Sequence, residues 1–120
     1  MALCSDIKSF LTSVESGMYI GNMPSSDSAS VVVPTGGYAP ERTLNNDTIT
    51  MPTVMIHVRD LSFATGYNRC IAIQNILDNV THTTVNGTFY ISIRRVGDIN
   101  YLGIDDRARH LFSMNYIIKK

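Results

Sequence analysis

The closing segment of the chain, residues 107–118, is apolar on both sides of a predicted strand. Its large apolar side chains alternate onto one side at Phe112, Met114, Tyr116 and Ile118, and onto the other side at Leu111 and Ile117. An antiparallel strand with one face in water alternates cleanly between apolar and polar residues instead. This strand therefore predicts a sheet with two apolar faces, each of which needs a cover.

Two segments have the periodicity of amphipathic helices. The first has one apolar stripe at Leu3, Ile7, Phe10, Leu11 and Val14. Gly17 follows it, where a left-handed cap would end the helix. The second helix is predicted to begin after the N-cap residue Ser62 and to run to about Asn79. Gly66 lies in its first turns, and we expect that start to fray because glycine costs about 1 kcal/mol relative to alanine.

Five segments are predicted to be strands: residues 18–20, 29–33, 52–60, 88–95 and 107–118. In the fourth of these, alternation predicts that Phe89, Ile91 and Ile93 face the core. The resulting order is α-β-β-β-α-β-β. With 120 residues there is room for one domain, residues 1–120. We predict an α+β fold, with a single mixed or antiparallel sheet of about five strands and two helices on one face.

Three connecting segments are predicted to be irregular. Between Pro34 and Thr50 the apolar residues follow neither the period of two of a strand nor the period of 3.6 of a helix. Pro34 is expected to end the strand at residues 29–33. Residues 81–87 and 96–106 are predicted to be a polar connector and a loop. A loop as long as the first is unusual inside a compact domain and is more often functional or mobile. It is long enough to reach a neighbouring molecule.

The predicted helices are too few to cover the predicted sheet. Five strands about 4.8 Å apart make a sheet some 20–24 Å wide, and two helices, each about 10 Å across, cover one face of it. The second face keeps apolar side chains around Met55 and Ile117. Such surface usually marks a partner interface, so we expect self-association. The alternative is a monomer in which the segment from Pro34 to Thr50 folds over the bare face.

The residues that could carry chemistry do not form a recognisable catalytic or metal-binding pattern. His57, His82 and His110 are not at metal-ligand spacing. Asp105 and Asp106 are adjacent, which fits a turn better than a converging acid–base pair. We predict that the protein is not an enzyme and that it has no catalytic, metal-binding or cofactor-binding residues and no cofactor.

Cysteine usage and the N-terminus indicate a protein made in a cytoplasm. Cys4 and Cys70 have no CxxC spacing and are expected to be buried thiols. The first eight residues lack the pattern of a secretory signal. No apolar run approaches the roughly 20 residues that cross a bilayer, so no membrane partner is expected.

The charge of the chain is balanced overall but not along its length. The formal net charge is zero, yet residues 94–120 hold six basic and three acidic side chains, and the rest is net negative by the same amount. Arg94 and Arg95, with Tyr90 and Tyr101 nearby, could touch nucleic acid by charge and stacking. Zero net charge and the absence of tryptophan favour a surface salt-bridging role or a subunit contact for these arginines instead. No specific nucleic-acid partner is expected.

Three stretches together form a recognisable combination. Residues 18–24, Met-Tyr-Ile-Gly-Asn-Met-Pro, follow the first helix; residues 54–59 form a strand that runs directly into the second helix; and residues 101–116 combine Tyr-Leu-Gly, an acidic turn, arginine and a Phe–Asn–Tyr strand. This combination resembles the tail terminator, or minor capsid, proteins of phages with long non-contractile tails. Residues 97–100 depart from that family, because a proline-rich lead-in is common there.

The resemblance implies a structural protein of the virion, at the head-proximal end of the tail, assembled in the host cytoplasm. It implies a homohexameric ring that caps the tail tube, ends its polymerisation and presents the head-joining surface. The implied partners are copies of itself, the tail tube protein and a head-completion or connector protein. Two alternatives remain open: another neck or tail subunit, such as a head-closure or tube protein, and a small nucleic-acid-binding α+β domain.

Overall fold

The computed structural model describes residues 2–15, 17–42, 44 and 48–120. In these residues there are two helices, α1 (Ala2–Phe10) and α2 (Phe63–Leu77), and one sheet of seven strands. The strands are β1 (Tyr19–Ile20), β2 (Ala29–Arg42), β3 (Thr48–Asp60), β4 (Thr81–Val85), β5 (Thr88–Arg95), β6 (Asn100–Ile104) and β7 (His110–Lys119). The predicted α+β class and single mixed sheet are confirmed, whereas the strand count of about five is wrong.

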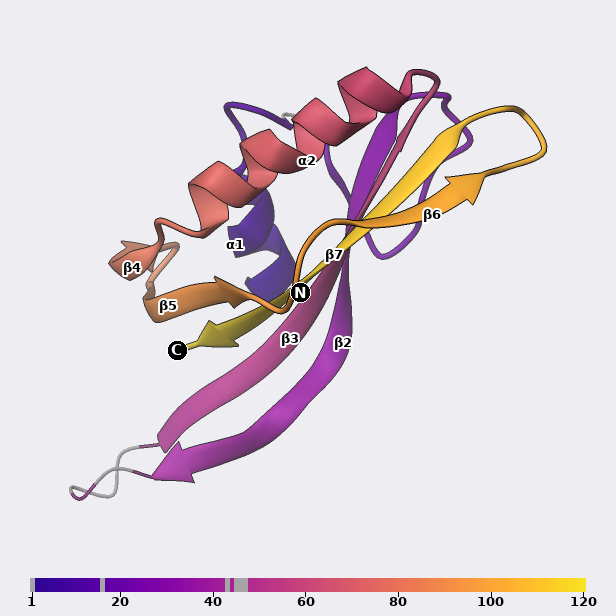
Figure 1. The fold of residues 1–120 in the computed structure, drawn as a ribbon. Helices are drawn as coiled ribbons and strands as arrows, with labels where there is room; N and C mark the ends of the chain where they lie inside the picture. Colours follow the sequence, from indigo (N-terminus) through magenta and orange to yellow (C-terminus); the bar gives the residue numbers. More distant parts are fainter. Residues whose placement is uncertain (1, 16, 43, 45–47) are drawn as a thin grey trace.

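The sheet runs in the order β1-β2-β3-β7-β5-β4, and β6 is added beside this path on β7 (Figure 1). Only β1 and β2 are parallel. β7 pairs with β3 along one edge. Its other edge is shared, because β6 pairs with residues 110–113 and β5 pairs with residues 116–119. The closing strand is therefore the centre of the sheet, which explains why it is apolar on both sides.

The two extra strands lie in segments that were expected to be irregular. β4 pairs with β5 through a two-residue turn at Asn86 and Gly87, whose φ angles are 49° and 82°. Asn-Gly with both residues at positive φ is the preferred connection of a tight hairpin. β6 pairs with β7 across the acidic turn, with one irregularity between Tyr101 and Gly103. The expectation of a connector over 81–87 and a loop over 96–106 is thus wrong for residues 81–85 and 100–104, and right for residues 86–87, 96–99 and 105–106.

Strand β2 does not end at Pro34 but continues to Arg42, paired with β3. Its register shifts twice, between Pro34 and Gly37 and again between Tyr38 and Glu41. β1 pairs only with Val31 and Val32, so the rest of β2 lies at the edge of the sheet. Proline is tolerated at an edge. A Cβ at Gly37 would lie 2.6 Å from the Met51 carbonyl oxygen, so this bulge requires glycine.

The distal parts of β2 and β3 form a two-stranded arm, residues 35–42 and 48–53, which extends beyond the rest of the sheet (Figure 1). The molecule consequently measures 53 × 24 × 23 Å along its principal axes. The prediction of an irregular loop between Pro34 and Thr50 is wrong for residues 34–42 and 48–50; residues 43 and 45–47 lie outside the described part of the chain.

Both helices pack against one face of the sheet in a single hydrophobic cluster. The cluster includes alternate residues of β3 and β7, together with residues from both helices and β5: Val54, Ile56, Val58, Phe112, Met114, Tyr116, Ile118, Leu3, Ile7, Cys70, Ile73, Leu77, Tyr90 and Ile93. In β5 the buried residues are Tyr90 and Ile93, whereas Phe89 is exposed and Ile91 half-buried, so the predicted inward set is only partly right. The Tyr90 hydroxyl donates to the buried Asp6 carboxylate of α1.

The boundaries of the two helices agree only in part with the sequence-based prediction. α1 ends at Phe10, before the predicted Val14, which is exposed. α2 begins as predicted, because the Ser62 hydroxyl accepts a hydrogen bond of 3.3 Å from the Thr65 N–H. Gly66 is buried inside a continuous helix, and a Cβ there would lie 2.6 Å from the Phe112 ring. Close packing, rather than fraying, is what glycine provides at this position.

Candidate assembly surface

The second face of the sheet, opposite the helices, is the candidate surface for contact with other molecules. Its residues are the other alternate set, in register across three strands: Val31 pairs with His57, and His57 pairs with Ser113. Residues such as Met55 and Ile117 are only half-buried. The described part of the arm continues along the strand direction and does not fold back over this face (Figure 1).

A short segment, residues 21–28, covers one end of the second face. Two arginines hold its backbone: Arg59 Nε donates to the Ser26 carbonyl oxygen at 3.0 Å, and Arg109 Nη1 donates to the Ser25 carbonyl oxygen at 3.0 Å. Arg59 also donates to the Pro24 carbonyl oxygen. Burial, followed by the nearby positive charge of Arg109, lowers the pKa of Arg59, but a guanidinium remains charged at any ordinary pH.

Asp105 organises the turn that carries Arg109. Its carboxylate accepts hydrogen bonds from the backbone N–H groups of Arg107 and Arg109, at 2.9 and 3.0 Å, and from Arg109 Nε at 2.8 Å. Desolvation raises the pKa of Asp105, but these hydrogen bonds outweigh it and the pKa is lowered. Asp106 is exposed and does not join this network in the described residues. The acidic pair is a turn, as predicted, and does not converge on a site.

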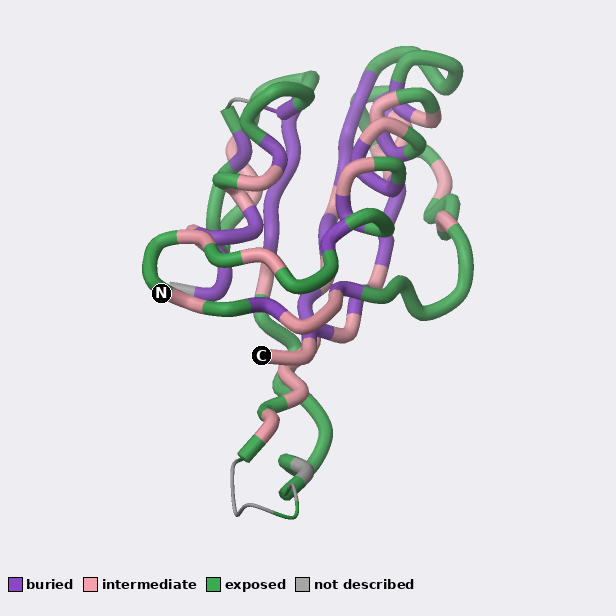
Figure 2. Tube along the Cα trace, turned by 90° about the vertical axis from the view of Figure 1, so that its left-hand side faces the viewer, coloured by how far each residue is buried: buried purple, intermediate pink, exposed green. Residues whose placement is uncertain are grey.

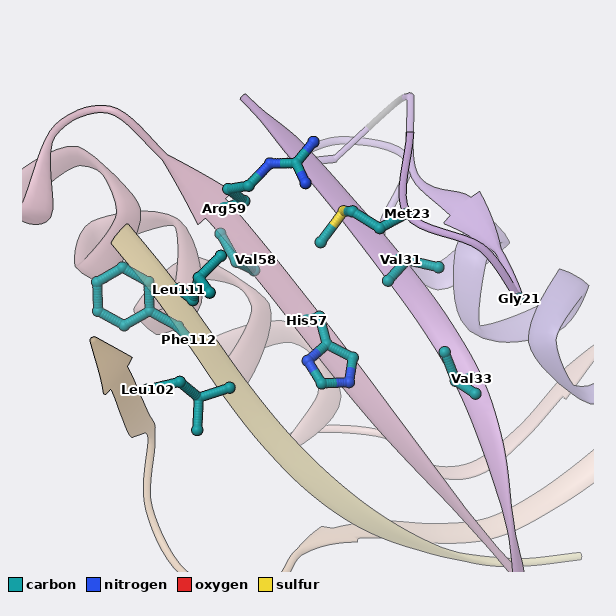
Figure 3. Close-up of a pocket in the computed structure, with 10 residues that line it drawn as sticks. All are labelled: Gly21, Met23, Val31, Val33, His57, Val58, Arg59, Leu102, Leu111 and Phe112. Atoms are coloured by element: carbon teal, nitrogen blue, oxygen red, sulfur yellow. The ribbon is translucent and has the colours of Figure 1, made fainter. Parts of the chain in front are cut away.

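Beside the covering segment lies an open groove of about 370 Å³ on the second face (Figure 3). Val31, Val33, His57 and Leu111 form its apolar floor, with Met23 from the covering segment on one side and Leu102 from β6 on the other. Burial lowers the pKa of His57, so at neutral pH the imidazole is uncharged. The groove therefore offers mainly packing surface, and the charged side chain among its lining residues, Arg59, is held by the carbonyl oxygens of Pro24 and Ser26.

The three histidines lie on different elements. His57 is in the groove; His110 Nδ1 lies 2.8 Å from the Tyr101 hydroxyl; and the His82 ring packs near Phe89. Within the described ranges no group of three or more His, Cys, Asp or Glu side chains could hold a metal ion. Across those same ranges, no helix has the length and apolarity to span a bilayer.

Cys4 and Cys70 are both buried, as predicted, with exposures of 0%. Burial raises the pKa of the Cys70 thiol to about 12. A thiol that stays protonated and out of contact with solvent is a poor nucleophile. These cysteines are core residues.

Arg94 and Arg95 are both exposed and line one hollow with Met51, Ile117 and Lys119 near the base of the arm. Arg95 also forms ion pairs with Asp78 at 3.3 Å and Asp98 at 3.7 Å. The surface salt-bridging role expected from the sequence is therefore confirmed for Arg95, and a subunit contact by either arginine stays a prediction.

One exposed surface was not anticipated from the sequence. We call it the β6 strip: Leu61, Phe63, Tyr101, Leu102 and Ile104, all large apolar residues and all exposed. Tyr101 packs on Phe63 at the start of α2, with a ring-centroid distance of 5.0 Å, whereas Leu102 lines the groove on the second face. Regular alternation of apolar residues is absent around Tyr101, where the sequence is Ile-Asn-Tyr-Leu-Gly-Ile, so periodicity gave no signal for this strand.

Together these features define a class of protein: a small α+β domain with a projecting arm and a partly apolar sheet face that residues 21–28 cover only at one end, with no cluster of metal-binding side chains in the part of the chain described. The sequence profile of the family described as "Bacteriophage tail terminator protein" matches residues 7–120. The chain belongs to this family, and it is a structural tail protein of a phage virion.

A solved structure has the same fold. The chain titled "Virion of native gene transfer agent (GTA) particle" superposes with a TM-score of 0.71 and 10% sequence identity, over 98% of this chain and 92% of that chain. At this identity the likeness concerns the fold alone. No curated protein sequence matches the chain.

Proposed function

We propose that copies of this protein form a closed ring, a homohexamer, that caps the tail tube and ends its polymerisation. One observation carries the proposal: the second face of the sheet keeps half-buried apolar residues, including Met55 and Ile117, and the described part of the arm does not cover them. A second molecule is then the available cover. A head-to-tail contact between identical copies either closes into a ring or continues as a filament.

The ring would end tube growth by being different on its two sides. One side docks on the last ring of the tail tube protein, and the other offers no equivalent surface for a further tube subunit. That other side joins the head through a head-completion or connector protein. We place the protein at the head-proximal end of the tail, with assembly in the host cytoplasm. The role is structural, and no catalytic step is part of it.

The decisive experiment is microscopy of particles that lack this protein. A terminator predicts overlong tubes, because nothing stops polymerisation. Tails of normal length without heads would instead indicate a head-closure protein, and the absence of tubes would indicate a tube subunit. Both of these outcomes contradict termination.

Ring formation has its own measurement. Native mass spectrometry of the protein, alone and with tail tubes, should show six copies associated as one species. A protein that stays monomeric at every concentration and on the tubes as well would refute the ring. A low-salt filter-binding assay tests the remaining alternative, since nucleic-acid binding through phosphate contacts gives strong, salt-dependent retention.

A further inference from the structure

The arm is a ribbon of two strands that the body supports only near its base. Thr50 exchanges backbone hydrogen bonds of 2.9 and 3.1 Å with Lys120, and the described arm residues beyond this point pair only with each other. Figure 2 shows that the described arm residues are mainly exposed, unlike the strands of the body. Residues 34–40 and 48–54 contain no charged side chain. Tyr38 is 58% exposed. An isolated two-stranded hairpin is marginally stable in water. An exposed ribbon with few charged residues is therefore suited to contact with another molecule.

The β6 strip is equally uncovered. β6 pairs with β7 along one edge, and its other edge has no partner strand within the described chain. Tyr101, Leu102 and Ile104 are 46%, 54% and 59% exposed. Residues 99–104 and 61–68 contain no charged side chain. Proteins usually protect a free edge with lysine, proline, an inward charge or a bulge. β6 has none of the first three, and its one irregularity lies between Tyr101 and Gly103.

The other edges of the sheet are poorer docking strands. The outer edge of β2 contains Pro34 and Pro40, which cannot donate to a neighbouring strand. β4 contains His82 at a φ of 46°, which interrupts regular extension. β1 is two residues long. The β6 edge is the free edge best suited to receive another chain.

We propose that the arm of one copy docks on the β6 strip of the next copy in the ring, a contact that rests on the ring proposed above. The arm carries charges only at Glu41 and Arg42 in its described residues, and the β6 strip carries none. Surfaces with so few charges suit each other, because the centre of a protein interface is depleted of charged residues and enriched in aromatic ones. The aromatic rings of Phe63 and Tyr101 are already packed together and need no ordering on binding.

The geometry fits a cyclic arrangement. The arm and β6 lie at opposite ends of the elongated molecule (Figure 1). Arm-to-strip contact is therefore heterologous: each copy gives its arm to one neighbour and receives an arm from the other. Each docking site is completed by a second copy, with Tyr38 contributed by one molecule and Ile104 by its neighbour.

An arm-shortened variant tests the proposal directly. Replacing residues 36–52 by Asn-Gly joins Thr35 to Thr53, whose hydroxyl oxygens are already 2.7 Å apart across the two strands. The core residues Val32 and Val54 are retained. We expect cooperative thermal unfolding to persist, and native mass spectrometry to show monomers where the unaltered protein assembles. Ile104→Lys, a change at an exposed position, should give the same loss without altering the arm.

Cross-linking between two singly substituted chains tests the pairing itself. Tyr38→Cys and Ile104→Cys proteins are mixed and treated with a short bismaleimide; the native Cys4 and Cys70 are 0% exposed and stay unreactive. Covalent dimers should form in the mixture and not in either protein alone. Asn75→Cys, exposed on α2, is the matched control and should not cross-link to Tyr38→Cys.

The outcomes separate this contact from the ring itself. If rings form but the mixture cross-links no more than the control, or if the arm-shortened and Ile104→Lys proteins both assemble normally, the arm-to-strip contact is wrong and the ring stands. If the unaltered protein forms no assembly, even with tail tubes present, both proposals fail together. Dimers in a single-variant sample would indicate a two-fold contact and would overturn the head-to-tail arrangement.

Discussion

Single residues show how closely α2 approaches the sheet. Gly66→Ala should destabilise the protein, because its Cβ would meet the buried Phe112 ring at 2.6 Å and Asp60 Cβ at 3.2 Å. Overpacking costs about 1–3 kcal/mol, and the better helix propensity of alanine returns about 1 kcal/mol. We expect a net loss of up to about 2 kcal/mol in the unfolding free energy measured with denaturant. Gly17→Ala, with no atom within 4 Å, is the control and should be neutral or slightly stabilising.

Asp105 gives a second test at the residue scale, through pH. Its lowered pKa in the folded protein means that its stabilisation is present above the ordinary carboxyl pKa, about 3.9, and disappears as pH falls through the lowered value. Asp105→Asn should therefore have a lower Tm than the parent at pH 7. The difference should shrink as both are measured at more acidic pH. Equal Tm values at pH 7 would contradict this role; Asp106→Asn, which lies outside the hydrogen-bond network, should leave Tm unchanged.

At the scale of elements, a regular period of apolar residues predicted helices and strands correctly, and segments without such a period were predicted wrongly. The helix after Ser62 and the strands around Ile56, Ile93 and Met114 could be predicted, because each has a clear apolar pattern. The outer half of β2 could not, since proline and glycine usually end a strand and here they are accommodated by bulges on an open edge. Strand β4 could have been predicted, because the Asn86-Gly87 dipeptide that follows it is typical of a tight β-hairpin turn.

The covering segment, residues 21–28, is an element that depends on distant side chains. Arg59→Met should release it, since Arg59 supplies hydrogen bonds to the carbonyl oxygens of Pro24 and Ser26. Removing the hydrogen bonds of a single charged side chain costs about 1.5–3 kcal/mol, so we expect a loss in this range. Limited proteolysis should then cut this segment faster than in the parent. Arg42→Met, at an exposed position of the arm, should change neither measurement.

At the scale of the whole molecule, comparing the two predicted helices with the width of the predicted sheet indicated that the helices leave one sheet face uncovered. This comparison succeeded because two helices cannot cover both faces of one sheet, however many strands it has. What it could not predict was the partial cover by residues 21–28. That segment is rich in serine and reads as solvent-exposed, and the arginines that hold it, Arg59 and Arg109, come from strand β3 and from the turn before β7. The arm and the β6 strip were equally hidden, because both depend on which strand lies at an edge.

The surface charge of the whole molecule yields the last prediction, which rests on the proposed docking to the tail tube. Arg94 is exposed beside Lys119 near the base of the arm, and exposed charges steer association more than they stabilise a fold. Arg94→Glu should leave the unfolding free energy within about 0.5 kcal/mol of the parent. In particles supplied with this variant, tails of defined length joined to heads should be fewer, and added salt should reduce the difference by screening.

Arg95→Glu is the contrasting substitution, because it removes the ion pair with Asp78 and places like charges together, so it should lower Tm as well. Normal tail lengths and normal head joining with Arg94→Glu would exclude an electrostatic part in docking. They would leave the apolar face and the arm as the surfaces that hold the ring to its partners.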